Sequence, residues 1–507
     1  MARINGGIIG PDNIPSGPLG SASGVWKLSD AFNYQKEGLW PVATGITYPV
    51  ANSLRFNSAS SDYLSRSATG STSETEATIS AWVKRSTTGS NHTIFNSSYQ
   101  DGSTYYFRIF INSSDQLEIE NKDGSTNLLY RTNQVFRDVS SFYHILVRLS
   151  LTESGNNRVK VYVNGEQVTS FATQTAMTGD QFLIGKNNYT VKIGNTNSGT
   201  SNYWNGYMSD VYGIYGTALT PTSFGETDSV SGNWKAKAYS GTYAANSFFL
   251  QFNNSGALGT DSSGQSSTFT VNNLTSVDQS TDTPTTVYAT MNPLDNFYGQ
   301  GTFSEGNLQI AQSDASYASL TSTMGVSSGK WYAEIKWTAQ TTGTFPALSW
   351  IGIVGSVATA TSMGVGNNAD SYSYIGDGSD GGKKRNNGSS SSYGDDYAVG
   401  DIIGIALDLD NNKIYWSKNG TFQNSGDPTS GATGTGSAFD LTTPSSGSYY
   451  FAVSDQHSGE SSTWQFNFGS PMYSANGYAD GNGFGDFSYA VPTGYYALNT
   501  QNINFQG

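Results

Sequence analysis

Short segments in which apolar and polar residues alternate recur along most of the chain. In Trp331–Trp337 the odd positions are apolar, and in Val159–Val163 three valines share one face. A period of two is typical of strands that bury one face and expose the other. Turn residues interrupt these segments at short intervals, and long helical patterns are missing. The pattern therefore predicts an all-β protein.

The strand patterns fall into two groups that are separated by a looser stretch. Residues 43–225 and residues 301–507 each hold enough strands for an antiparallel β-sandwich of the jelly-roll type. Residues 226–300 are rich in Ser and Thr with scattered apolar positions, which predicts an ordered connector. Residues 1–42 are rich in Gly and Pro with little periodicity, which predicts an irregular N-terminal arm. We therefore expect two sandwich domains, a connector and an arm.

The arm has few apolar residues with which to fold by itself. A short helix is expected from Ser29, which can cap it. The large side chains Trp26, Phe32 and Trp40 give the arm something to bury against another protein. We therefore predict that the arm anchors the chain to a larger particle.

Composition and charge exclude several classes of binding partner and site. The chain has 25 basic and 39 acidic residues, so its formal net charge is −14. Phosphate binding needs an excess of Lys and Arg, so no nucleic-acid partner is expected. Cysteine is absent, which excludes disulfides and thiolate metal sites. No apolar run is long enough for membrane insertion, and the first 25 residues lack the apolar core of a signal peptide.

Two sets of motifs point to known families. The first set is SASSDYLSR, ATISAWVKRST and RVKVYVNGEQV, followed by YWNGYMSDVYGIYGTALTPTSF. On these motifs residues 43–225 resemble the laminin-G-like, concanavalin-A-like jelly roll. The second set is GKWYAEIKW, WIGIVGS and GDIIGIALDLDNNKIYWSKNGTF. On these, residues 303–470 resemble a SPRY (B30.2-type) domain. Both resemblances imply two-sheet sandwiches that serve mainly in binding.

A third resemblance covers the arrangement of the chain as a whole. The opening GGIIGPDNIPSGPLGSASGVWKLSDAFNYQKEGLWP, the stretch LGTDSSGQSSTFTVNNL and the ending VPTGYYALNTQNI are similar to segments of structural proteins of tailed, marine-type bacteriophages. This resemblance implies a protein of the virion surface that is made in the host cytoplasm and contacts other virion proteins. It also implies a homo-oligomer, which would be a trimer in a fibre.

The inventory of catalytic residues argues against an enzyme. The chain has only three histidines, His92, His144 and His457, and no GxSxG turn precedes a predicted helix. Glu118 and Glu120 lie on the same face of one predicted strand, as the acids of concanavalin-like glucanases do. A glucanase would need a third acid between them, where this chain has an isoleucine. We therefore expect no catalytic site and interpret the two acids as a solvated strand edge.

Metal and anion sites are weakly indicated. Asp408 and Asp410 imitate the start of a calcium loop, but the later Gly and Glu of such a loop are missing, so a hairpin turn is expected. We expect no cofactor. Calcium on the acids of a predicted rim loop is an alternative, and its candidate ligands are Asp377, Asp380 and Asp395. The basic run Lys383–Arg385 is expected at a solvated loop tip.

Aromatic residues in polar surroundings are the remaining signal. Exposed Tyr and Trp rings stack on sugar rings, while neighbouring amides and carboxylates bind hydroxyl groups. In the first domain the candidates are Tyr189, Tyr203 and Trp204. In the second domain, within a rim loop predicted over residues 366–398, the candidates are Tyr372, Tyr374, Tyr393 and Tyr397. These rings predict a site for a host-surface glycan on either domain.

These observations favour a non-enzymatic virion protein, a tail fibre or surface appendage that adheres to host-surface glycans. A capsid decoration or cement protein is an alternative, because the same arm would anchor it. A cell-surface adhesin and a glycan hydrolase of the concanavalin-like type are further alternatives. The missing signal segment counts against the adhesin, and the set of acids counts against the hydrolase.

Overall fold

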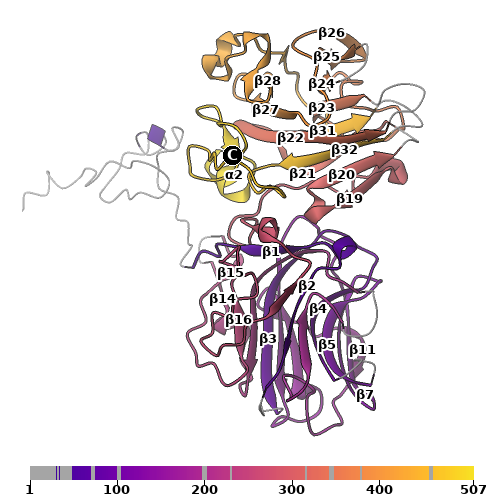
Figure 1. The fold of residues 1–507 in the computed structure, drawn as a ribbon, viewed down its shortest axis with the longest axis vertical. Coiled ribbons are helices and arrows are strands. Elements are labelled where there is room, and N and C mark those ends of the chain that lie inside the picture. The colour runs from indigo at the N-terminus through magenta and orange to yellow at the C-terminus, as the bar shows by residue number, and fades with distance from the viewer. Residues whose placement is uncertain are drawn as a thin grey trace, which may run out of the picture.

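The fold was analysed in a computed structural model of the chain. It describes residues 30, 33–34, 48–69, 75–99, 104–196, 202–228, 231–313, 317–341, 348–376, 380–455 and 461–506. Residues Asp30, Asn33 and Tyr34 are helical, as expected near Ser29. The proposed anchor residues Trp26, Phe32 and Trp40 lie outside the described residues. The rest forms two lobes, one above the other in Figure 1.

The first lobe is an antiparallel β-sandwich of two eight-stranded sheets, the lower lobe in Figure 1. One sheet has the order β10 (Glu166–Gln167), β9 (Val159–Val163), β8 (Tyr143–Ser150), β3 (Glu76–Arg85), β13 (Gly206–Tyr215), β1 (Ser53–Phe56) and β18 (Gln279–Ser280), with β16 (Phe248–Leu250) beside β13. The other has the order β11 (Phe171–Thr175), β7 (Ser125–Val135), β6 (Gln116–Asp123), β5 (Tyr105–Ile111), β4 (His92–Ser98), β12 (Thr190–Ile193), β2 (Tyr63–Ser67) and β17 (Thr270–Asn272).

The second lobe is also a sandwich, and only one of its strand pairs, β22 with β33, is parallel among the described residues. Its nine-stranded sheet has the order β19 (Gly301–Ser304), β20 (Gln309–Ser313), β32 (Ser461–Asn467), β22 (Lys330–Thr341), β27 (Ile402–Asp408), β28 (Lys413–Lys418) and β29 (Thr421–Phe422), with β30 (Phe439–Asp440) on β28 and β33 (Tyr496–Ala497) on β22. Its six-stranded sheet has the order β21 (Leu320–Val326), β31 (Tyr449–Asp455), β23 (Ser349–Val354), β24 (Ser371–Gly376), β25 (Lys383–Asn386) and β26 (Ser389–Ser392).

Local sequence explains the hairpins. Val159, Val161 and Val163 of β9 all point into the first core, as their spacing predicts. The following Asn164 and Gly165 both have positive φ, 49° and 83°. A two-residue turn between β9 and β10 needs this geometry, and Asn-Gly adopts it readily. The predicted all-β fold with two jelly-roll sandwiches is thus confirmed.

Residues 226–300 do more than connect the lobes. They contribute β16, β17 and β18 to the first sandwich, so strands from this segment extend both of its sheets. A small ribbon of β14 (Gly225–Thr227) and β15 (Trp234–Ala236) lies beside them. The apolar side chains of Phe248, Leu250 and Phe269 explain this placement, because they complete the first core. The first sandwich therefore extends well beyond residue 225.

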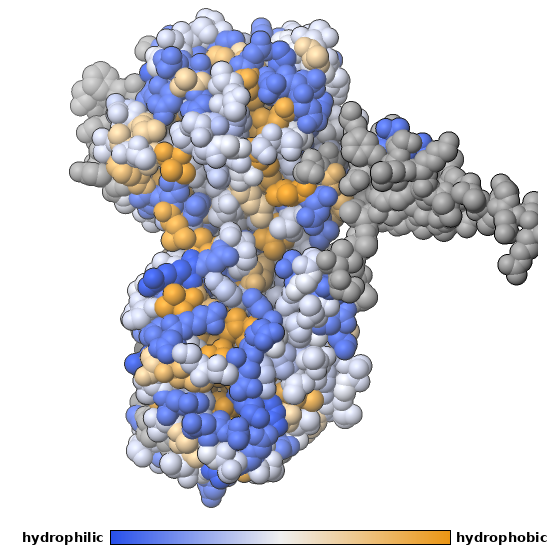
Figure 2. Space-filling model, turned by 180° about the vertical axis from the view of Figure 1, so that it is seen from behind, coloured by the Kyte–Doolittle hydropathy of each residue, from blue (hydrophilic) through white to orange (hydrophobic). Residues whose placement is uncertain are grey.

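The waist between the lobes is held by buried polar contacts. Lys84 Nζ lies 2.8 Å from Asp282 Oδ2, and both side chains are almost fully buried. The Tyr207 hydroxyl donates to Gly306 O over 3.0 Å. Seen from the opposite side, Figure 2 shows hydrophobic side chains among polar ones at this waist. The C-terminal helix α2 (Thr500–Gln506) is short, and no helix in the described ranges is long and apolar enough to cross a bilayer.

Candidate functional site

A group of interacting polar and aromatic side chains lies on the outer face of the first lobe's second sheet, the one that contains β5, β6 and β12. Residues on β5 alternate between the two faces of the sheet, as the strand period requires. Phe107 and Ile109 point into the core, whereas Tyr106, Arg108 and Phe110 point outward. The guanidinium carbon of Arg108 lies 4.6 Å from the Tyr106 ring centroid and 4.8 Å from that of Phe110. Two rings thus hold one cation in place.

Two glutamates on the neighbouring strand β6 belong to the same face. Glu120 is paired with Arg108, and it also accepts a hydrogen bond from the Tyr106 hydroxyl over 3.1 Å. Burial raises the pKa of Tyr106 to about 12, so this phenol stays a donor at neutral pH. Glu118 accepts from Arg131 Nε over 2.6 Å. The two acids therefore share a face, as predicted, but each is engaged by an arginine and neither is a solvated edge residue.

The face continues across the sheet to two tyrosines. Lys192 on β12 lies opposite Asn96 on β4, and Asn96 lies opposite Arg108 on β5. Lys192 Nζ is 4.6 Å from the ring centroid of Tyr63, and its burial lowers its pKa. The Tyr203 ring lies 6.2 Å from the Tyr63 ring. Both tyrosines are only half-buried, so part of each ring remains accessible.

We call this group the outer-face site. It comprises Tyr63, Asn96, Tyr106, Arg108, Phe110, Glu118, Glu120, Arg131, Lys192 and Tyr203. Five of these side chains are partly exposed, namely Tyr63, Arg108, Arg131, Lys192 and Tyr203, and the other five are buried. The exposed part of the site combines tyrosine rings with cationic groups, and aromatic rings beside polar groups are a combination by which proteins bind sugars. Of its residues, only Tyr203 was singled out as a ligand candidate from the sequence. The alternation of side-chain direction along the strand that holds Glu118 and Glu120 was the sequence signal that could have located the other residues of this site.

The candidate tyrosines of the second lobe are not exposed, so that expectation is wrong. Tyr372, Tyr374, Tyr393 and Tyr397 are all at least nine-tenths buried in the second core. The segment predicted as a rim loop instead forms β24, β25 and β26. Tyr397 donates to Ser349 O over 2.6 Å and to Tyr374 O over 3.0 Å. Burial raises the pKa of Tyr374, Tyr393 and Tyr397.

Two candidates of the first lobe are buried as well. Trp204 is fully buried, and Tyr189 is 8% exposed and packs against Tyr99 with ring centroids 5.6 Å apart. Both belong to the first hydrophobic core. The polar residues next to them in the sequence belong to the flanking turns, so they do not indicate the direction in which these two rings point. The expected exposure of Tyr189 and Trp204 is therefore corrected.

The structure describes two of the three predicted calcium candidates. Asp380 lies 2.5 Å from Lys383 Nζ, Asp395 is exposed, and Asp377 lies outside the described residues. Within the described ranges no group of three or more His, Asp or Glu side chains is arranged to hold a metal ion. Asp408 accepts from Asn411 N over 3.0 Å in the turn between β27 and β28, which is the expected hairpin.

The basic run Lys383–Arg385 is not a loop tip. It forms β25, and each of its side chains has a protein partner. Lys384 Nζ donates to Ala438 O over 2.5 Å, and Arg385 Nε donates to Asn367 Oδ1 over 2.9 Å. The three cations are therefore used within the second lobe.

One histidine imitates a catalytic dyad. His144 Nε2 lies 2.8 Å from Ser80 Oγ, but its Nδ1 accepts a hydrogen bond from Trp234 Nε1 over 3.0 Å. A triad would place a carboxylate at that position. Complete burial lowers the pKa of His144 to about 3, and burial lowers that of His92 to about 3 as well. His457 lies outside the described residues.

The comparisons with known proteins agree with the two lobes. Residues 57–223 match a family model described as the concanavalin A-like lectin/glucanases superfamily, and residues 330–469 match the SPRY domain model. No curated protein matches the chain.

Solved structures that are similar to parts of the chain include the following three. The SPRY domain of human HERC1 is 16% identical, with 35% of this chain and 96% of that chain covered, at a TM-score of 0.26. A putative carbohydrate binding protein from Bacteroides ovatus is 17% identical, with 44% and 58% covered, at 0.29. The CBM40 of a Ruminococcus gnavus sialidase, bound to sialyllactose, is 12% identical, with 30% and 80% covered, at 0.24. By the family models, the chain contains a concanavalin A-like domain followed by a SPRY domain.

Proposed function

We propose that this chain is a non-enzymatic protein of a tailed-bacteriophage virion, which binds a host-surface glycan through the outer-face site. The observation that carries the glycan part is the pair of partly exposed rings, Tyr63 and Tyr203, beside Lys192 and the Arg108–Glu120 pair. Partly exposed tyrosine rings suit the CH face of a pyranose, and the neighbouring charged groups suit its hydroxyls. The match of residues 57–223 to a superfamily that includes lectins supports the same ligand class.

The carboxylates of the site support binding without hydrolysis. A glycosidase needs one acid that holds a proton and a second that acts as nucleophile or base. Here Glu118 is hydrogen-bonded to Arg131, and Glu120 is paired with Arg108. Both carboxylates are therefore held by side chains of the protein itself, an arrangement that suits a structural role better than proton transfer to a leaving group.

The virion part of the proposal is supported by the sequence resemblance of the arm, the connector and the C-terminal segment to phage structural proteins. On a particle the chain would be present in many copies, as a homo-oligomer and a trimer in a fibre. A single shallow site binds a monosaccharide at millimolar Kd, about −4 kcal/mol. Many linked sites raise avidity without new contacts.

The glycan part is tested with a glycan array and a panel of bacterial envelope polysaccharides. The protein is applied as a monomer and as a multivalent conjugate, in the wild type, in a Tyr63→Ala, Tyr203→Ala double variant and in Tyr478→Ala. Tyr478 is an exposed tyrosine of the second lobe and serves as the matched control. We expect binding by the multivalent wild type and the control, with about tenfold weaker binding by the double variant.

Equal binding by the double variant would overturn the assignment of the site, and measurable shortening of any glycan would overturn the non-enzymatic assignment. Silence of the multivalent wild type would favour a capsid decoration protein. The virion part is tested by removing residues 1–42. The truncated chain is expected to fold and to fail to join particles, and normal incorporation would contradict the anchoring role of the arm.

A further inference from the structure

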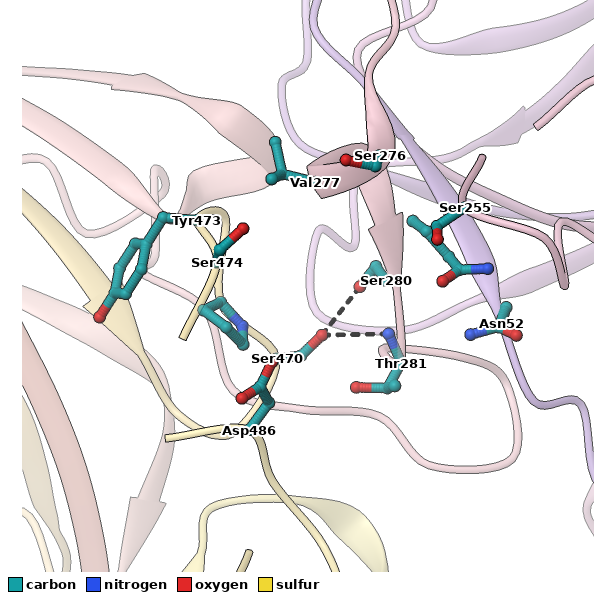
Figure 3. A pocket seen from close by; sticks show the side chains of 12 residues that line it. Asn52, Ser255, Ser276, Val277, Ser280, Thr281, Ser470, Tyr473, Ser474 and Asp486 are labelled. Atoms are coloured by element: carbon teal, nitrogen blue, oxygen red, sulfur yellow. Dashed lines mark hydrogen bonds between the residues drawn. The ribbon is translucent and has the colours of Figure 1, made fainter. Parts of the chain in front are cut away.

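A pocket of about 300 Å³ opens at the waist between the two lobes, and its lining shares no residue with the outer-face site. The first lobe contributes Asn52 and Ser255, and the second lobe contributes Ser474 and Asp486. Figure 3 shows these two pairs on opposite sides of the pocket, with Ser280 and Ser470 between them. The pocket therefore exists only where the lobes meet.

The floor of this waist pocket is buried and fixed by hydrogen bonds. Ser280 Oγ lies 2.9 Å from Ser470 Oγ, and Thr281 N donates to Ser470 Oγ over 3.2 Å. Both serines are less than 5% exposed. Behind the wall, Arg55 Nη2 donates to Val277 O over 2.9 Å, and Arg55 Nε lies 3.6 Å from Glu305 Oε2 of the second lobe. The two walls are thus held at a set separation, which lowers the ordering cost of binding a ligand.

The lining determines the class of ligand. It consists mainly of serine and threonine hydroxyls and two amides, with Val277, Pro471 and Tyr473 as apolar or aromatic surface. Hydroxyls and amides both donate and accept hydrogen bonds, as the hydroxyls of a polyol do. The lining holds no Lys, Arg or His, and Asp486 is its one carboxylate. An anionic ligand would therefore find no counter-charge, and its burial would be costly.

We propose that the waist pocket binds one neutral, hydroxyl-rich molecule of about the size of a single sugar ring. The volume lies at the lower end of the range for small-molecule sites, which excludes an oligosaccharide. The proposal does not rest on the proposed function of the outer-face site. Because both lobes supply its walls, the ligand binds only when the lobes are docked and stabilises the docked chain.

The test uses the full chain with glucose, galactose, mannose and sorbitol as separate probes and glucuronate as the anionic control. Binding is measured by saturation-transfer NMR and by the rise in Tm. Ser474→Trp places a large side chain at the exposed rim of the pocket, and Ser389→Trp makes the same change on the exposed strand β26 as a matched control. We expect millimolar binding of at least one neutral probe, weakened at least about tenfold by Ser474→Trp and unchanged by Ser389→Trp.

A second variant, Asn52→Ala, removes one rim amide and is expected to weaken binding about threefold to tenfold. The Tyr63→Ala, Tyr203→Ala variant is expected to leave this binding unchanged, so failure of the outer-face site and failure of the waist pocket are distinguishable. The proposal is overturned if no neutral probe binds up to about 100 mM. It is also overturned if Ser474→Trp binds as the wild type does, or if glucuronate binds as tightly as the neutral probes.

Discussion

The two lobes are both β-sandwiches, yet the tyrosines that lie among polar residues in the sequence fall on different faces of two of their sheets. In the first lobe Tyr63 on β2 lies on the outer face beside Lys192, and both Tyr63 and Tyr203 remain partly exposed. In the second lobe Tyr372 and Tyr374 of β24 turn into the core, and the outer face of the same strand carries Ile375 against Trp350. Polar neighbours in the sequence are therefore no guide to exposure. The face of the strand on which a ring falls decides it.

The outer faces differ in their chemistry for the same reason. In the first lobe the outward positions of β5 and β6 hold Arg108, Glu118 and Glu120, which pair across strands or with β7. In the second lobe the outward residues Trp350 and Val354 of β23 and Ile375 of β24 form a small apolar cluster with Val365 from the segment that follows β23. The sheet of β5 and β6 thus keeps a polar outer face, whereas the sheet of β23 and β24 carries a small apolar core on its outer face.

The largest expected effect comes from deleting a core tyrosine of the second lobe. Tyr397→Ala removes a buried ring together with its hydrogen bonds to Ser349 and Tyr374, and is expected to lower the free energy of unfolding by about 3–5 kcal/mol. Tyr63→Ala in the first lobe is expected to cost less than about 1 kcal/mol. Denaturant unfolding of the full chain measures both. Similar costs for the two variants would break the comparison.

The waist between the lobes gives the next effect. Lys84→Met leaves the buried Asp282 without its cation, at an expected cost of about 3 kcal/mol in the free energy of unfolding. The double variant Lys84→Met, Asp282→Asn removes the unpaired charge and is expected to recover at least half of that cost. Thermal and denaturant melts of the three chains decide the point. A double variant as unstable as the single one would show that the ion pair is not the cause.

A buried acid of the first lobe makes its stability depend on pH. Burial raises the pKa of Asp210 from 3.8 to about 7. Between these values the folded state holds a proton that the unfolded state has lost, so the free energy of unfolding falls as pH rises through this window. Asn stays neutral and tolerates the φ of 45° at this position.

Asp210→Asn is therefore expected to add about 1–3 kcal/mol at pH 8 and to change little near pH 4. Unfolding curves of the wild type and the variant between pH 4 and 8 measure the difference. A variant that keeps the full pH slope of the wild type would contradict the role of Asp210.

The smallest effects compare two surface cations. Arg108→Ala in the first lobe unpairs the largely buried Glu120 and is expected to cost about 1–2 kcal/mol of unfolding free energy. Lys383→Ala in the second lobe breaks a pair whose side chains are both about one-third exposed, with an expected cost below about 0.5 kcal/mol. Equal costs would mean that the outer face of the first lobe is no more organised than an ordinary surface.

Much of the fold was predictable because it depends on sequence patterns that span only a few residues. The period-two alternation of β9 and β22, and the Asn164-Gly165 turn, act within a few residues, so they survive without knowledge of the rest of the chain. The pairing of residues 226–300 with the first sandwich was not predictable in the same way. The local sequence around Phe248 and Phe269 does not show which hydrophobic core these rings join, because that depends on contacts with strands far away in the chain.

For the candidate site as well, local sequence predicted one part and tertiary contacts decided the other. The sequence by itself determined that Glu118 and Glu120 share a strand face, because their spacing of two allows nothing else in a strand. Only the tertiary structure decided that arginines from β5 and β7 neutralise them, that four tyrosines of the second lobe are core residues, and that two separate lobes form a polar pocket at their waist. Strand register, sheet order and lobe docking join residues far apart in the chain, and a pattern that repeats every two residues carries no information about such pairs.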